Sequence, residues 1–293
     1  MSKGSIAVGL SRAVRSLQGL SLGDAFGQRF FRPDALPRIE GRTLPDAPWR
    51  WTDDTEMALS IVEELGAKGT IDPDSLAQRF ASRYDSTRGY GAGAHEWMGL
   101  VRGGMSWRLA APMLFEGQGS YGNGGAMRVA PLGAYFGGDP KRAAEEARKS
   151  AMVTHAHPEG QAGAIAIAVA ASMVSIRPHP PGKDLLLQVL PHVPPGPTRD
   201  GIEAALALNP QDTLAAALKL GSGDQVASQD TVPFALFCAA HHLTDFQQAM
   251  WETVSGLGDR DTTCAIVGGI VAMTSEPPAP WLKAREPLPD LRG

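Results

Sequence analysis

Helical periodicity is the dominant pattern along this chain. Apolar residues recur at three- and four-residue spacing, which places them on one face of an α-helix. Asp-Pro pairs mark several starts, with Asp at the N-cap and Pro at the first helical position, and glycines mark several ends. The pattern predicts helices over residues 6–26, 54–66, 73–84, 139–153, 160–175, 199–208, 211–219, 229–242, 244–256 and 261–273.

Strand signals are weak by comparison. No stretch alternates β-branched and aromatic residues with polar ones over five or more positions, and aromatic residues make up only 6% of the chain. The helical segments are rich in Ala and Gly, which lets helix backbones approach closely. We therefore expect a compact all-α bundle whose loops carry the polar chemistry.

Two segments are dense in proline. Residues 177–200 contain seven prolines around a short apolar stretch at 184–190, which predicts a short helix. We interpret this segment as a surface excursion within one domain, because the candidate chemistry lies on both sides of it. Residues 276–293 are also rich in proline and are expected to form a surface tail after a single domain at 1–275.

Composition excludes some function classes. With 43% hydrophobic residues the chain can bury a core, and a formal net charge of −4 does not favour binding to a nucleic-acid backbone. Cys238 and Cys264 lie in apolar runs, which predicts reduced core thiols. The N-terminus lacks a signal-peptide pattern, and the longest apolar run, at 162–171, is too short to cross a bilayer. We expect a cytoplasmic monomer that does not associate with membranes.

Candidate metal ligands occur in two short motifs near opposite ends of the chain. One is Thr52-Asp53-Asp54-Thr55 and the other is Asp259-Arg260-Asp261-Thr262-Thr263, and each runs into a helical pattern. Their hard oxygens suit Mg²⁺, Mn²⁺ or Ca²⁺. Simple N-capping of the following helix is the alternative for the second motif. If the motifs meet, four carboxylates share a small volume and require cations.

Glycine-rich loops form the second candidate feature, at residues 88–93 and 119–128. Repeated glycines before a helix expose backbone N–H groups to an anion such as a phosphate. Each loop also holds an aromatic residue, Tyr90 or Tyr121. The pair of loops favours a phosphorylated, ring-bearing ligand such as a nucleotide, and ordinary flexible turns are the alternative.

A pair of histidines, His155 and His157, precedes Pro158. Histidines two residues apart can bind zinc, but no Cys or HExxH partner supports such a site here. Because Pro158 indicates a helix terminus, we expect these side chains to cap a helix, donate hydrogen bonds or stack on a ring.

Five motifs, taken in order, resemble the ADP-ribosylglycohydrolase family, which includes the dinitrogenase-reductase-activating glycohydrolase and the ADP-ribosyl-acceptor hydrolases. They lie at residues 19–27, 51–55, 121–128, 154–155 and 258–262, and the resemblance extends from about residue 5 to 273. It implies an all-α orthogonal bundle of that family's type. It also implies an enzyme that releases ADP-ribose from a modified protein or from a small ADP-ribose conjugate.

The same resemblance implies a site with two Mg²⁺ or Mn²⁺ ions. Two such cations can hold ribose hydroxyls and activate a water, and Asp53 or Asp54 is expected to take its proton. The residues that match the family's pattern are Thr52, Asp53 and Asp54 as one ligand group, Asp259, Asp261 and Thr262 as the other, Gly89, Gly91 and Gly93 around the diphosphate, Ser120, Tyr121, Gly122 and Asn123 at the distal ADP-ribose, and His155 at the adenosine side.

One departure from the family's pattern concerns the acceptor. Serine-type members carry a loop glutamate just after the GDAxG motif, whereas residues 28–31 here read Gln-Arg-Phe-Phe. This favours arginine-linked or small-molecule substrates, with Phe30 or Phe31 stacking on a guanidinium. It leaves the general acid/base unassigned, and Asp34 or Asp85 is the alternative source of an acid.

Two other functions stay open at this point. Residues 259–263 also fit the DxDxT pattern of haloacid-dehalogenase-type phosphatases, but that scheme needs a buried strand just upstream, which residues 253–258 do not predict. The other is a non-catalytic ADP-ribose-binding module. The missing loop glutamate favours such a module, and the six ligand matches disfavour it.

Overall fold

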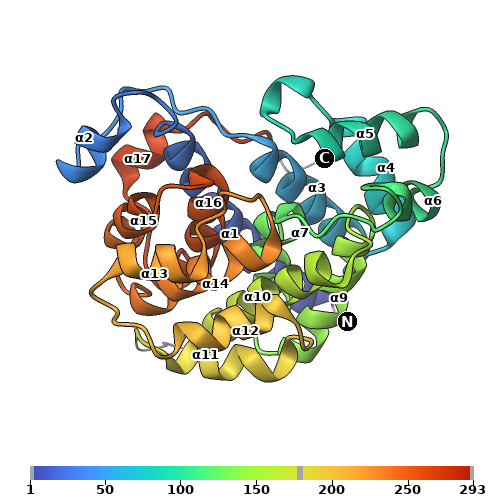
Figure 1. Cartoon of the computed structure of the whole chain (residues 1–293). Coiled ribbons are helices and arrows are strands. Elements are labelled where there is room, and N and C mark those ends of the chain that lie inside the picture. The colour runs from blue at the N-terminus through green and yellow to red at the C-terminus, as the bar shows by residue number, and fades with distance from the viewer. Residues whose placement is uncertain (1–2, 177–180, 291–293) are drawn as a thin grey trace.

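The computed structural model describes residues 3–176 and 181–290, and within that part it contains helices and two isolated β-bridges but no strand. The all-α prediction is therefore confirmed (Figure 1). The α-helices are α1 (Lys3–Gln28), α2 (Ala35–Glu40), α3 (Asp53–Lys68), α4 (Pro73–Arg83), α5 (Ala92–Arg102), α6 (Trp107–Met113), α7 (Gly124–Met127), α8 (Ala130–Tyr135), α9 (Pro140–Met152), α10 (Pro158–Val174), α11 (Asp184–Val189), α12 (Pro197–Ala205), α13 (Thr213–Leu220), α14 (Ser228–His241), α15 (Phe246–Ser255), α16 (Arg260–Val271) and α17 (Ala279–Ala284), with 3₁₀ turns η1 (Ser86–Arg88) and η2 (Leu190–His192).

All ten predicted helices form, and the short helix predicted at 184–190 is α11. Asp72, Asp139 and Asp245 cap their helices by accepting backbone N–H groups, as their positions before the helical patterns predict. The predicted stop at Gly66 is wrong, because α3 continues to Lys68 and ends at Gly69, whose φ is 70°. Part of the proline-dense excursion, residues 177–180, lies outside the described residues, as do residues 291–293 of the predicted tail.

Helices α1 and α16 cross with their backbones in direct contact. Gly19, Gly23 and Gly27 recur every fourth residue on α1, so they share one face. A Cβ built on Gly23 would lie 2.0 Å from the carbonyl oxygen of Cys264, and one on Gly19 would lie 2.2 Å from that of Gly268. These glycines form what we call the glycine seam, which brings the N-terminal and C-terminal parts of the chain together.

The seam lies among other buried helices. Helix α10 is apolar on all sides, and residues 162–171 are buried as the sequence predicts. Figure 1 shows α4, α5 and α6 grouped on one side of the molecule and α13, α15 and α17 on the other, with α1, α10, α14 and α16 between them. Within the described part of the chain, no helix combines the length and the hydropathy needed to cross a membrane.

The segment after residue 275 packs against the rest of the protein. Trp281 of α17 is buried and stacks on Phe26 of α1, with ring centroids 5.0 Å apart. Glu286 pairs with Arg88 at 2.8 Å. The proposed division into a domain at 1–275 and a tail at 276–293 stays a prediction. Both cysteines are buried and free, as predicted.

Candidate metal centre and ligand pocket

One cavity, of about 480 Å³, contains almost every predicted site residue in its wall. These are Asp53, Asp54, Gly89, Gly91, Gly93, Ser120, Tyr121, Gly122, Asn123, His155, Asp259, Asp261 and Thr262. The exception is Thr52, which is buried with its hydroxyl oxygen 3.0 Å from Asp54 Oδ2. Segments from both ends of the chain therefore meet at one pocket.

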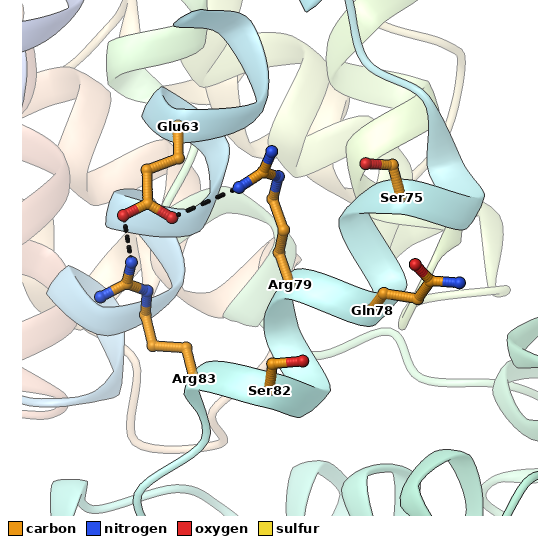
Figure 2. A pocket seen from close by; sticks show the side chains of 6 residues that line it. All are labelled: Glu63, Ser75, Gln78, Arg79, Ser82 and Arg83. Atoms are coloured by element: carbon orange, nitrogen blue, oxygen red, sulfur yellow. Dashed lines mark hydrogen bonds and ion pairs between the residues drawn. The ribbon is translucent and has the colours of Figure 1, made fainter. Parts of the chain in front are cut away.

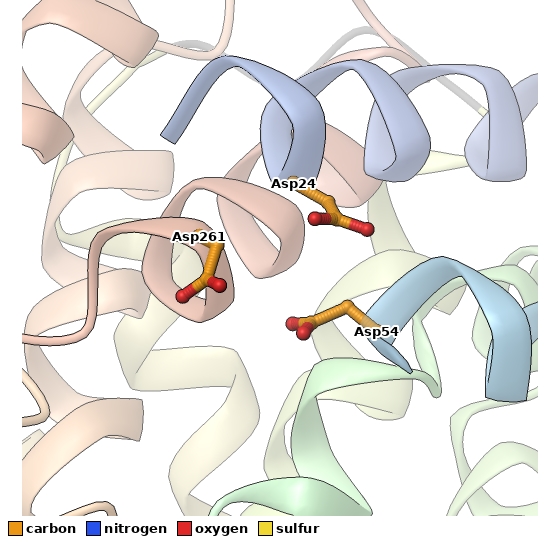
Figure 3. A group of neighbouring side chains, drawn as sticks. All are labelled: Asp24, Asp54 and Asp261. Atoms are coloured by element: carbon orange, nitrogen blue, oxygen red, sulfur yellow. The ribbon is translucent and has the colours of Figure 1, made fainter. Parts of the chain in front are cut away.

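Carboxylates gather at one end of this pocket. Asp24 of α1, Asp54 of α3 and Asp261 of α16 point toward a common space (Figure 3), and one oxygen of each lies within 4.8 Å of the others. Asp54 Oδ1 is buried without a hydrogen-bond partner in the described residues. A buried carboxylate oxygen without a donor, beside other carboxylates, fits a position that faces a cation.

Asp24 belongs to this group but differs from its neighbours. Its Oδ1 accepts from the Thr52 hydroxyl at 2.8 Å, and its Oδ2 accepts from the Thr52 backbone N–H at 2.9 Å and the Thr55 hydroxyl at 2.5 Å. With both oxygens engaged, Asp24 holds the start of α3 in place and leaves Thr52 lone pairs free for a cation. Sequence reasoning assigned it no role, although Asp24 is the one ionisable residue between Arg15 and Arg29.

The N-capping alternative for the second motif is wrong. Asp259 occupies the N-cap position of α16, but its side chain makes no capping bond. Its Oδ2 instead accepts from Asn123 Nδ2 at 2.7 Å. The phosphatase alternative also fails, because α15 and a short turn, rather than a strand, precede Asp259.

Burial and mutual repulsion shift the titration of these carboxyls. Burial, with nearby Asp24, raises the pKa of Asp53 to about 8, and burial raises that of Asp24 to about 6. The pKa values of Asp54 and Asp261 are also raised, first by burial and then by neighbouring carboxylates. Oxygen-only donors, raised pKa values and the partnerless Asp54 oxygen fit a divalent cation, so the described residues suit the predicted cofactor.

Divalent cations are expected to stabilise the protein, and more so at alkaline pH. The folded-state pKa values of Asp24 and Asp53 exceed their unfolded values. In the absence of cations, the contribution of these two residues to the free energy of unfolding is therefore fully present below about pH 4 and is lost as the pH rises toward 8. Mg²⁺ or Mn²⁺ at about a hundred times its Kd should raise the melting temperature by about 5–10 °C. Scanning calorimetry at pH 5 and pH 8 should show the larger increase at pH 8, and an unchanged response in Asp261→Asn would exclude Asp261 as a ligand.

Around Gly89, Gly91 and the start of α5, the pocket wall is formed largely by backbone. Gly89 has a φ of 91°, and Gly91 occupies the N-cap position of α5. Ala92, Gly93 and Ala94 also line the cavity, so the free N–H groups of an eleven-residue helix start here. A helix N-terminus favours an anion through both its N–H groups and its dipole.

The loop that carries these glycines is fixed from two sides. Glu56 Oε2 accepts from the Asp85 backbone N–H at 3.0 Å and from the Tyr90 hydroxyl at 2.7 Å. Arg88 stacks over Trp51 with its guanidinium carbon 3.4 Å from the ring centroid. Tyr90, one of the two aromatics noted in the glycine-rich loops, is thus a buried structural residue and does not line the pocket.

Another part of the pocket wall carries two exposed aromatic rings. Phe115 and Tyr121 are 50% and 41% exposed, with ring centroids 6.4 Å apart. Sequence reasoning found Tyr121 but missed Trp97, Met98, Leu114, Phe115, Met127, Arg128, Thr154, Gln225 and Val226, which also line the cavity. Most of these residue types are ordinary core or loop residues, and only the fold places them here.

The two histidines differ in role. His157 caps α10 by accepting from the Glu159 N–H at 3.1 Å and packs edge-on against Tyr121, as one of the sequence alternatives predicts. His155 lines the pocket beside Gly122 and Gly124. Neither belongs to the carboxylate group.

The two acids proposed as alternatives to the loop glutamate are both engaged in hydrogen bonds. Asp34 pairs with Arg38 at 2.7 Å, which lowers the pKa of Asp34, and bonds from Thr87 lower that of Asp85. Both are therefore ionised near neutral pH and poorly suited to donate a proton. Phe30 is completely buried and cannot reach a substrate, whereas Phe31 is 48% exposed.

A second cavity, of about 640 Å³, lies between α3 and α4 and is lined by Glu63, Ser75, Gln78, Arg79, Ser82 and Arg83 (Figure 2). Glu63 pairs with both Arg79 and Arg83, and Glu64 also pairs with Arg79 at 2.7 Å, so each arginine already has an acidic partner. None of the predicted site residues lies there. We therefore interpret it as a salt-bridged surface groove.

Comparison with known proteins gives a consistent picture. A family model described as ADP-ribosylglycohydrolase matches residues 7–291. ADP-ribosylhydrolase ARH3 of Bos taurus is 30% identical over 89% of this chain and 84% of that protein. ADP-ribosyl-[dinitrogen reductase] glycohydrolase of Rhodospirillum rubrum is 30% identical over 53% of this chain and 55% of its own length. A solved ADP-ribosylglycohydrolase-related protein complex matches with a TM-score of 0.59 at 22% identity, over 96% of this chain and 94% of that one, which supports the fold alone.

Proposed function

This chain belongs to the ADP-ribosylglycohydrolase family, and from that premise we propose that it is a metal-dependent hydrolase that cleaves the bond between ADP-ribose and an acceptor. It is thus an enzyme of the glycosidic-bond hydrolase class. The further proposals concern its metal ions, its catalytic residues and its acceptor.

The order of surfaces along the pocket supports this function best. A Cβ on Gly89 would lie 3.8 Å from Asp53 Oδ1 and one on Gly93 would lie 2.8 Å from the Phe115 ring, so the start of α5 lies between the carboxylates and the exposed aromatic ring of Phe115. ADP-ribose has the same order, with a hydroxyl-rich ribose, an anionic diphosphate and a flat adenine. Ring stacking at Phe115 and Tyr121 and anion binding at α5 are each established forms of recognition.

Two cations, Mg²⁺ or Mn²⁺, would be held by Thr52, Asp53 and Asp54 on one side and by Asp259, Asp261 and Thr262 on the other. When bound, they would orient the ribose hydroxyls and polarise the attacking water. Asp53 and Asp54 are the proposed proton acceptors. Asp53 is the more exposed of the two, and it lies beside the Gly89 loop. Asp24 keeps Thr52 oriented by accepting a hydrogen bond from the Thr52 hydroxyl.

The acceptor is proposed to be arginine. No carboxylate lies at residues 28–31, and Asp34 and Asp85 are tied up as anions, so the leaving group receives no evident proton from this side. A protonated guanidinium can leave as neutral guanidine, whereas a serine alkoxide needs an acid. Phe31 is exposed, but it does not line the pocket and already carries the Arg260 guanidinium 4.9 Å from its ring centroid, so a substrate guanidinium would have to use its other face. The substrate is then an ADP-ribosylated protein or a small conjugate, and a monomeric cytoplasmic enzyme stays our expectation.

ADP-ribosyl-arginine is expected to be cleaved about tenfold or more faster than ADP-ribosyl-serine, since a positioned acid is worth at least that factor for the serine linkage. The measurement compares kcat/KM for matched peptides carrying each linkage, and for an acetyl-linked ADP-ribose, with Mg²⁺ or Mn²⁺ present. A serine preference would overturn the acceptor proposal. If the protein releases ADP-ribose from none of these substrates, the proposed function itself is overturned.

A further inference from the structure

A buried arginine forms part of the wall of the ligand pocket. Arg128 is completely buried, and its guanidinium lies over the ring of Phe80 with the carbon 4.6 Å from the centroid. Its Nη2 donates to the Ser150 carbonyl at 2.9 Å and to the Thr154 hydroxyl at 3.0 Å. Among the described residues no carboxylate pairs with it. A buried cation without an ion-pair partner is costly, so this arrangement calls for a role.

Arg128 restricts the direction of the hydrogen bond between Thr154 and His155. A guanidinium can only donate, so the Thr154 oxygen accepts from Arg128. The single hydroxyl hydrogen of Thr154 still needs an acceptor, and His155 Nδ1, at 2.7 Å, is the acceptor recorded for it among the described residues. Because Nδ1 accepts that hydrogen, a neutral imidazole carries its own proton on Nε2.

The other ring nitrogen of His155 lies beside Gly122 and Gly124 of the pocket wall. A Cβ on Gly124 would lie 3.2 Å from Nε2, and the residue lines the cavity. Nε2 makes no hydrogen bond to another described residue, whereas Nδ1 is fully engaged. Burial and the nearby Arg128 also lower the pKa of His155 to about 3, so the ring stays neutral at physiological pH.

We propose that Arg128, acting through Thr154, locks His155 as its Nε2–H tautomer, so that His155 selects a hydrogen-bond acceptor at the adenosine end of the ligand. The ligand assignment rests on the proposed function, whereas the tautomer rests only on the hydrogen-bond chain. Arg128 and Thr154 are positioning residues in this scheme. Since α7, α9 and α10 carry or flank the three side chains, the ring orientation is set by packed helices (Figure 1).

The tautomer can be observed directly. Two-bond ¹H–¹⁵N spectra of the full chain at neutral pH should show His155 with a protonated Nε2 and a bare Nδ1, the signals being assigned among the seven histidines with His155→Gln. Thr154→Ser keeps the hydroxyl and should preserve this pattern. Thr154→Val keeps the shape but removes the donor, so its His155 should shift to the Nδ1–H form or to a mixture.

Binding supplies the second readout. ADP-ribose should bind Thr154→Val about three- to tenfold more weakly than the parent or Thr154→Ser, the loss expected for one misdirected hydrogen bond. Calorimetry with ADP-ribose measures this without turnover, and an unchanged melting temperature shows that the fold is retained. Nδ1–H in the parent, or the parent's tautomer and affinity in Thr154→Val, would overturn the proposal. If the parent fails to bind ADP-ribose, the proposed function falls, and the spectra still decide the tautomer.

Discussion

Replacing Asp261 with asparagine is expected to lower the rate of ADP-ribose release by about a hundredfold or more. Asp261 lies fully within the carboxylate group, with an oxygen within 4.8 Å of oxygens of Asp24 and Asp54. An amide keeps the shape but loses the negative charge and offers one weaker oxygen. Changes to groups that only support a ligand already cost about 10–100-fold, so loss of a ligand should cost at least as much. Initial rates across a series of Mg²⁺ and Mn²⁺ concentrations measure the effect.

Two controls sharpen this experiment. Glu203→Gln removes an exposed carboxylate far from the pocket and should leave the rate unchanged. Chelation of the parent should abolish release, and added cation should restore it. Full activity in chelator, with metal removal confirmed by elemental analysis, would refute metal dependence. Full activity in Asp261→Asn would leave metal dependence intact but remove Asp261 from the ligand set.

Replacing Gly23 with alanine is expected to destabilise the protein by about 3 kcal/mol or more. The new methyl group would lie 2.0 Å from the Cys264 carbonyl oxygen, so α1 and α16 would have to separate. Intrinsic helix propensity acts in the opposite direction, because alanine is favoured over glycine by about 1 kcal/mol inside a helix. The sign of the change in unfolding free energy therefore shows whether packing at the glycine seam or intrinsic helix propensity has the larger effect. Urea unfolding midpoints measure this change.

Gly99 is the matched control. It also lies inside a helix, α5, but a Cβ there meets nothing within 4 Å. Gly99→Ala should be neutral or stabilise the protein by up to about 1 kcal/mol. If both alanine variants gain stability, the close approach of α1 and α16 is not needed for folding.

Local signals in the sequence were sufficient for the longer helices. Asp72 and Asp139 announce helix starts through interactions within a few residues, and those caps form as expected. Helices α5 to α8 were missed because glycine and proline interrupt them, as at Gly93, Gly99 and Pro112. Their stability comes from packing against neighbours, which a single window of sequence does not contain.

The candidate site also contains some residues that local sequence identifies and others whose roles only the fold reveals. Acidic and glycine-rich motifs identify themselves by chemistry, and they converge on one pocket. Asp24 and Arg128 are different, because their roles depend on partners distant in sequence, Thr52 and Thr154. Phe30 was a reasonable candidate for stacking until its burial among Phe26 and Trp251 was known.

The glycine seam also constrains the order in which the protein can assemble during synthesis. Residues 19–27 leave the ribosome well before their packing partners at 260–268. Until then α1 has no neighbour for its glycine face, and the proposed cation site lacks Asp259 and Asp261. The contact between α1 and α16 therefore forms late. Chains that terminate before α16 should depend on chaperones and be degraded.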